Sequence, residues 1–185
     1  MSSPAAPAGN ILRRFRRNRR GSAAVEFALV APIFFGLLFA IIELALVFFA
    51  SQVLETVTQD SARTIMTGQA QNGQVTGCST PCTQAQFKNL VCSKITVMFD
   101  CVGGVSIDVQ SYSAFGSVNI ADPINASRNF VPPNNYLPGG PGDIVVVRIF
   151  YQWPLVVTGL GFNIANLSGS KRLLTATAAF QNEPY

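Results

Sequence analysis

Few residues in this chain have side chains and spacings that could do chemistry. The pair Gly21-Ser22 separates six arginines, all within residues 13–20, from an apolar run that continues to Ala50. Glu26 lies near the start of that run, where a carboxylate in lipid is costly unless it is partnered or close to the interface. If a protease cuts between Gly21 and Ser22, only the basic leader is lost, and Glu26 needs a group that neutralises it.

The order of these parts differs from that of a secretory signal peptide, in which the apolar segment precedes the cleavage site and is removed. Here the apolar segment follows Gly21-Ser22, so cleavage would remove residues 1–21 and keep the membrane helix. About 20 apolar helical residues cross a bilayer, and residues 22–50 are enough to do so. The arginines place the N-terminus in the cytoplasm by the positive-inside rule. A nucleic-acid-binding patch is the alternative explanation of the cluster.

The run GSAAVEFALVAP behind a basic leader resembles the TadE family of minor pilins, or pseudopilins, from tight-adherence (Tad) pilus systems. The resemblance is strong over residues 13–65 and returns in the C-terminal AAFQNEPY. It implies cleavage by a prepilin peptidase after Gly21, which leaves Ser22 as the first mature residue. Glu26, on the same helix face, could then pair with the freed amino group in its own or a neighbouring subunit. The main pilins of these systems carry Glu-Tyr where this chain has Glu-Phe, which favours a minor subunit.

Composition limits the classes of function. The 185-residue chain has thirteen Lys and Arg, nine Asp and Glu, and no His. Without the six leader arginines the formal net charge changes from +4 to −2, so the basic pI does not indicate acidic partners and we expect no nucleic acid. Histidine is the commonest general base and metal ligand. Because no nucleophile with a positioned base appears either, the sequence predicts no enzyme, no catalytic residue, no metal site and no cofactor.

The four cysteines follow the membrane segment, so the positive-inside orientation puts them on the oxidising side of the membrane, where disulfides form. Their spacing, C-x3-C and then C-x8-C, matches no common zinc pattern. A disulfide needs Cα atoms within about 7 Å. We expect a short helix between Cys82 and Cys92 and a strand between Cys92 and Cys101, which would hold the members of each pair apart. The predicted disulfides are therefore Cys78–Cys92 and Cys82–Cys101.

The hydrophobic pattern predicts an α+β fold with a long N-terminal transmembrane helix packed on a small antiparallel β-sheet of about four strands, and the resemblance implies that this fold is pilin-like. The helix is expected from Ser22 to about Met66, with a stop near Gly68 and an amphipathic outer half. The expected domains are a cleaved basic leader (1–21), the transmembrane helix (22–50), its extramembrane continuation (51–67) and a small disulfide-containing α+β domain outside the cytoplasm (68–185).

Shorter patterns predict the elements of the outer domain. Thr83, with Gln86 three residues later, forms a capping-box signature that opens a short helix over residues 84–91. The other expected elements are a hairpin of residues 94–99 and 105–110 across Gly103-Gly104, a surface connection over 113–142, and strands over 143–153 and 171–181. The connection is expected to be a linker, with a partner-binding surface as the alternative.

Glu43 is the second carboxylate of the apolar run. It lies 17 residues after Glu26, which is a helical rise of about 25 Å. We therefore expect solvation at the far interface to explain it, with a subunit contact in a pilus as the alternative.

The resemblance implies a minor pilin of a type IVc-like Tad pilus that contributes to pilus assembly, adhesion and biofilm formation. Its partners would be the membrane, a prepilin peptidase, other pilus subunits and the assembly platform. The expected location is the inner membrane, with a single pass, a cytoplasmic N-terminus and a periplasmic C-terminal domain, or the extracellular pilus after assembly. The alternative is an uncleaved single-pass envelope protein whose outer domain scaffolds or binds a secretion-system partner.

Overall fold

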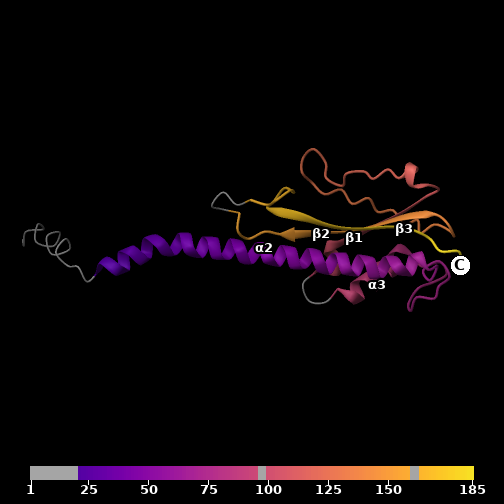
Figure 1. Cartoon of the computed structure of the whole chain (residues 1–185), viewed down its shortest axis with the longest axis horizontal. Coiled ribbons are helices and arrows are strands. Elements are labelled where there is room, and N and C mark those ends of the chain that lie inside the picture. Colours follow the sequence, from indigo (N-terminus) through magenta and orange to yellow (C-terminus); the bar gives the residue numbers. More distant parts are fainter. Residues whose placement is uncertain (1–20, 96–98, 159–162) are drawn as a thin grey trace, which may run out of the picture. The chain divides into compact units, whose positions relative to one another are not determined.

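The structure, a computed structural model, describes residues 21–95, 99–158 and 163–185. Within them the elements follow in the order α2 (Ser22–Met66), α3 (Gln84–Lys94), α4 (Cys101–Gly104), β1 (Val105–Tyr112), η2 (Phe115–Ser117), β2 (Ile144–Pro154) and β3 (Lys171–Gln181). The chain separates into two compact units whose boundary lies between Ile41 and Ile42, inside α2. The second unit contains the sheet and the later helices (Figure 1). The predicted long helix packed on a small antiparallel sheet is confirmed.

β2 is the central strand of an antiparallel sheet with the order β1-β2-β3. Its register places Ile149 opposite Ile107 of β1 and Ala176 of β3. Every residue of β2 from Ile144 to Tyr151 is buried, which explains the nearly continuous apolar sequence of this strand. The strands predicted over residues 105–110 and 171–181 are present as β1 and β3, but the described residues form a three-stranded sheet in place of about four strands.

The two faces of the sheet are covered differently, because successive strand residues point to opposite faces. The inner face shares the main core with α2 and α3, and this core includes Leu54, Ile65, Phe87, Val109, Val147 and Ile149. A smaller cluster on the opposite face contains Phe150, Leu167 and Leu173, with Ile124 and Phe130 packed against it. The helices thus cover one face, while the connection over residues 113–142 covers the other (Figure 1).

The C-terminal end of α2 is closed by a glycine and by the end of the chain. Gly68 has a φ of 73°, a left-handed conformation that favours glycine, and its N–H donates to the Ile65 carbonyl at 3.0 Å. A Cβ at this position would overlap the ring of Tyr185. The N–H of Glu183 donates to the Met66 carbonyl at 2.9 Å. The predicted stop near Gly68 is therefore confirmed, and the C-terminal residues cover it.

α3 begins with the predicted capping box. The Thr83 hydroxyl accepts the N–H of Gln86, and the Gln86 side chain accepts the N–H of Thr83 at 2.9 Å. The helix extends to Lys94, three residues beyond the predicted end. Phe87 and Val91 of this helix are buried in the main core.

The predicted hairpin across Gly103-Gly104 is wrong. β1 pairs with β2, and the two glycines are the last residues of α4. Asp100 starts this turn, because its carboxylate accepts the N–H of Gly103 at 3.2 Å. The other strand of the predicted hairpin was expected over residues 94–99. Lys94 belongs to α3, and neither Ile95 nor Phe99 is in a strand, while residues 96–98 lie outside the described residues.

The outer edge of β1 is occupied by part of the long connection. The N–H of Val109 donates to the Asn135 carbonyl at 2.9 Å, and the N–H of Leu137 donates back to the Val109 carbonyl at 2.8 Å. Tyr136, between them, packs its ring 5.6 Å from that of Phe87. This short bridge protects the sheet edge that a fourth strand was expected to cover.

The predicted disulfide pairing is also wrong. Cys78 is joined to Cys82, and Cys92 to Cys101, with Cα atoms 4.7 Å and 5.6 Å apart. The prediction assumed that a strand separates Cys92 from Cys101. The structure instead has α3 ending at Lys94 and a helical turn beginning at Cys101, so the chain returns and the two cysteines meet.

Non-reducing peptide mapping is expected to give a simple pattern. Trypsin would leave Cys78 and Cys82 within one peptide, residues 64–88, and would link peptide 89–94 to peptide 95–128 through Cys92–Cys101. Either alternative pairing would join all three peptides into one species, because Cys78 and Cys82 would each hold a different partner peptide. A three-peptide species in the mass spectrum would contradict the pairing in the structure.

Candidate functional site

The N-terminal end of α2 carries the predicted processing and assembly residues. Gly21 directly precedes the helix, and Ser22 is its first residue. The Ser22 hydroxyl donates to Oε1 of Glu26 at 3.0 Å, one helical turn further on. Both side chains are exposed in this single chain. The structure thus brings Ser22 and Glu26 together, whereas residues 1–20, with the arginine cluster, lie outside the described residues.

The first half of α2 exposes apolar side chains on all sides. Their exposed fractions run from 38% to 69% for Val25, Phe27, Leu29, Val30, Ile33, Phe34, Phe35, Leu37, Leu38, Phe39, Ile41, Ile42, Leu44, Leu46, Phe48 and Phe49. In the described part of the chain, α2 is the one helix long and apolar enough to cross a membrane. A core helix of a soluble protein would bury such residues, but only 11% of the apolar window of α2 is buried. Lipid or other apolar helices therefore fit this surface.

Glu43 lies in the second unit and holds the loop that follows β2. Its carboxylate accepts the backbone N–H of Val156 and also that of Val157, the latter at 3.1 Å from both carboxylate oxygens. Hydrogen bonds from backbone N–H groups to a carboxylate are charge-assisted and strong. The structure gives Glu43 a partner that neither predicted explanation included, more than 110 residues away in the same chain.

Comparison with known proteins gave a match in the N-terminal part of the described chain. The family model of TadE-like proteins matches residues 21–63. We call this stretch, which is similar to that family, the TadE-like segment. It contains the predicted processing pair, Glu26 and Glu43, and it covers most of α2 but none of the sheet. The resemblance inferred from the sequence is confirmed for this part of the chain. Neither the curated proteins nor the solved structures gave a match.

Outside the TadE-like segment, the sheet carries a buried ion pair that sequence reasoning missed. Asp108 of β1 and Arg148 of β2 are cross-strand partners. Nη2 and Nε of Arg148 both donate hydrogen bonds to Oδ2 of Asp108, at 2.7 Å and 3.0 Å. The side chains are 1% and 4% exposed. Asn135 donates to Oδ1 of Asp108 at 2.8 Å, and Arg148 donates to the Ala121 carbonyl at 2.9 Å.

These contacts connect two positions of the 113–142 connection, Ala121 and Asn135, to the outer face of the sheet. The sequence held one weak signal for the pair, a single arginine inside an apolar strand and a single aspartate in an alternating one. The pair itself could not be recognised before the strand register was known.

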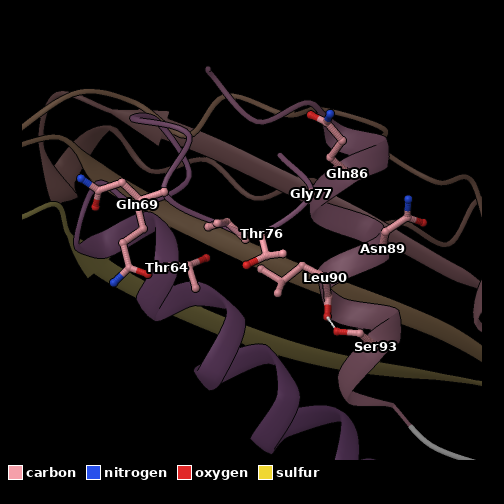
Figure 2. A pocket seen from close by; sticks show the side chains of 10 residues that line it. Thr64, Gln69, Thr76, Gly77, Gln86, Asn89, Leu90 and Ser93 are labelled. Atoms are coloured by element: carbon pink, nitrogen blue, oxygen red, sulfur yellow. Dashed lines mark hydrogen bonds between the residues drawn. The ribbon is translucent and has the colours of Figure 1, made fainter. Parts of the chain in front are cut away.

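A polar cleft of about 600 Å³ lies between the end of α2, the loop after it and α3 (Figure 2). Most of its lining is neutral amide and hydroxyl side chains, namely Thr64, Gln69, Gln74, Thr76, Gln86, Asn89 and Ser93. Val75 and Leu90 add apolar surface, and the Ser93 hydroxyl donates to the Leu90 carbonyl. Among the described lining residues none carries a charge, so this cleft offers hydrogen bonds but no acid–base pair.

Two tyrosines outside the TadE-like segment have raised pKa values. Burial raises the pKa of Tyr136 from 10.0 to about 12, and its hydroxyl has no hydrogen-bond partner among the described residues. Burial is the larger cause that raises the pKa of Tyr185, and the negative charge of Asp143 is the smaller one. Because the folded protein favours the neutral hydroxyl of Tyr136, this group contributes fully to the free energy of unfolding below the pKa that it has in the unfolded chain. The contribution is lost as the pH rises from about 10 to 12. Both groups are therefore neutral at physiological pH.

The titratable side chains of the described residues do not assemble into a metal centre. In that part of the chain, no three His, Cys, Asp or Glu side chains lie together as a possible ligand group. The four cysteines are all used in disulfides, which leaves no thiolate to bind zinc.

Proposed function

We propose that this chain is a minor pilin, or pseudopilin, of a Tad pilus and that a prepilin peptidase processes it between Gly21 and Ser22. The observation that carries the proposal is the TadE-like match, which begins at Gly21, directly ahead of α2. The arginine-rich leader would be removed, and the mature chain would begin with the apolar helix. The role is structural, contributing to pilus assembly and through it to adhesion and biofilm formation.

The geometry at the start of α2 suits such processing. Ser22 and Glu26 already lie within hydrogen-bond distance in the uncleaved chain. Cleavage would convert the Ser22 amide into a charged amino group one turn from the carboxylate, and the two charges would compensate each other in an apolar environment. A mature subunit would then offer the exposed apolar side chains of α2 to neighbouring helices without an uncompensated charge.

In the proposed topology, residues 1–21 are cytoplasmic before cleavage, residues 22–50 span the inner membrane, 51–67 continue the helix and 68–185 form the periplasmic domain. The arginine flank supports the orientation. The two disulfides support an oxidising compartment for the domain. The prepilin peptidase, the assembly platform and the other pilus subunits are the proposed partners.

The test is the N-terminus of the protein extracted from native membranes. The unmodified chain is expected to begin at Ser22 by intact-mass spectrometry. Gly21→Leu should retain residues 1–21, because the bulky side chain blocks the position before the cut. Gly36→Leu, a matched substitution within the same helix, should still be cleaved. If native material keeps its arginine leader, the chain is not a processed pilin and the uncleaved envelope protein is the remaining interpretation.

A further inference from the structure

We propose that the loop Leu155–Thr158 is a second membrane contact of this protein, held in the lipid headgroup region by Glu43. Val156 is 88% exposed, the highest value among the large hydrophobic side chains of the described residues. The stretch from Pro154 to Thr158 contains no charged side chain. A single exposed valine is ordinary on a protein surface, so the proposal rests on where this one is held.

The position of Glu43 along α2 defines the level at which Val156 is held. The 21 residues from Ser22 to Ile42 precede Glu43 in the helix and rise by about 31 Å at 1.5 Å per residue. The hydrocarbon core of a bilayer is about 30 Å thick. With Ser22 at the cytoplasmic boundary, Glu43 therefore lies at the outer boundary. Because Val156 and Val157 donate to its carboxylate, their loop lies at the same level.

The helix surface around Glu43 is continuous with the lipid-facing part of α2. Ile42, Leu44 and Leu46 are each 45–48% exposed, and the first helix residue buried by the domain is Val47. Lipid can thus reach α2 up to the level at which the domain begins to pack on it.

The hydrogen bonds also explain why the loop can approach lipid. Where β2 ends, the N–H groups of Val156 and Val157 leave the sheet and would lack partners away from water, which is costly. The carboxylate satisfies both, and they in turn compensate its charge at a depth where a lone carboxylate is unfavourable. Glu43 is therefore a positioning residue that makes both itself and the loop compatible with the interface.

Tryptophan fluorescence in lipid nanodiscs tests the contact. Val156→Trp, in a full-length chain with Trp153→Phe, is placed in phosphatidylcholine–phosphatidylglycerol discs with and without lipids that carry a nitroxide near the headgroup end of the acyl chain. The matched control is Val131→Trp, since Val131 is 55% exposed and belongs to the connection on the other sheet face. The expected result is a blue-shifted emission and several-fold stronger quenching for Val156→Trp than for the control.

If the Trp153→Phe chain fails to fold, Val156→Trp and Val131→Trp are compared in the chain that keeps Trp153. Glu43→Ala should lower the quenching at position 156 toward that of the control, while Glu43→Gln, which keeps one acceptor oxygen, should retain part of it.

Equal quenching at positions 156 and 131 overturns the membrane contact, as does a blue shift that nitroxide lipids do not quench, since another protein surface would then cover the loop. Quenching unaffected by Glu43→Ala overturns the role of Glu43. The proposal requires membrane insertion, but it does not require cleavage at Gly21.

Discussion

Replacing Arg148 by Met is expected to lower the free energy of unfolding by about 3–5 kcal/mol. The substitution removes the guanidinium but keeps much of the apolar stem. Asp108, 1% exposed, would then be a buried carboxylate with only amide donors left, namely Asn135 and Gln110. The carbonyl of Ala121 would also lose its donor. Urea unfolding of the full chain in detergent, followed through the single tryptophan, measures the change.

Two controls separate the ion pair from general effects of the substitution. Arg172→Met removes an arginine of β3 whose side chain donates to one backbone carbonyl, that of Ile164 at 2.8 Å, and should cost less than about 1.5 kcal/mol. The double variant Asp108→Leu with Arg148→Met should recover part of the lost stability, because no buried charge remains unpaired. If Arg148→Met is no more destabilising than Arg172→Met, the pair does not hold the connection on the sheet.

Local sequence signals predicted much of the architecture. The capping residues Thr83 and Gln86 determine where α3 begins, and Gly68 determines where α2 ends, because both act through bonds within a few residues. The apolar β2 was recognisable because a central strand with two covered faces needs no polar positions. The proximity of Ser22 and Glu26 at the start of α2 was predictable for the same reason, since the two residues are one turn apart.

The errors concern contacts between distant parts of the chain. The partner of β1 lies 40 residues away, as the pair Asp108–Arg148 shows, whereas the predicted hairpin chose the nearest strand-like segment. The disulfide error followed from that hairpin, because an assumed strand kept Cys92 from Cys101. Glu43 could not be matched with its loop for the same reason, since nothing in the sequence around Val156 marks it as the partner of a helix carboxylate.

Replacing Glu26 by Ala is expected to reduce incorporation of this chain into pili by about a hundredfold or more. After the proposed cleavage the Ser22 amino group is positive and lies one turn from this residue. Without the carboxylate, that charge would enter an apolar helix bundle unpaired, at a cost of about 3–5 kcal/mol. The measurement is the amount of the chain in the sheared filament fraction relative to the membrane fraction, determined by immunoblotting.

The matched control for this substitution is Glu55→Ala, on the same helix but outside the predicted membrane span. Glu55 accepts a hydrogen bond from Gln59 at 3.0 Å on the helix surface, a contact of little energetic weight. Incorporation of that variant should equal that of the unmodified chain. The Glu26→Ala chain should still begin at Ser22, because the carboxylate acts after cleavage, and this separates failed assembly from failed processing. Glu26→Ala pili that contain the normal amount of this chain would show that the carboxylate does not compensate the terminal charge.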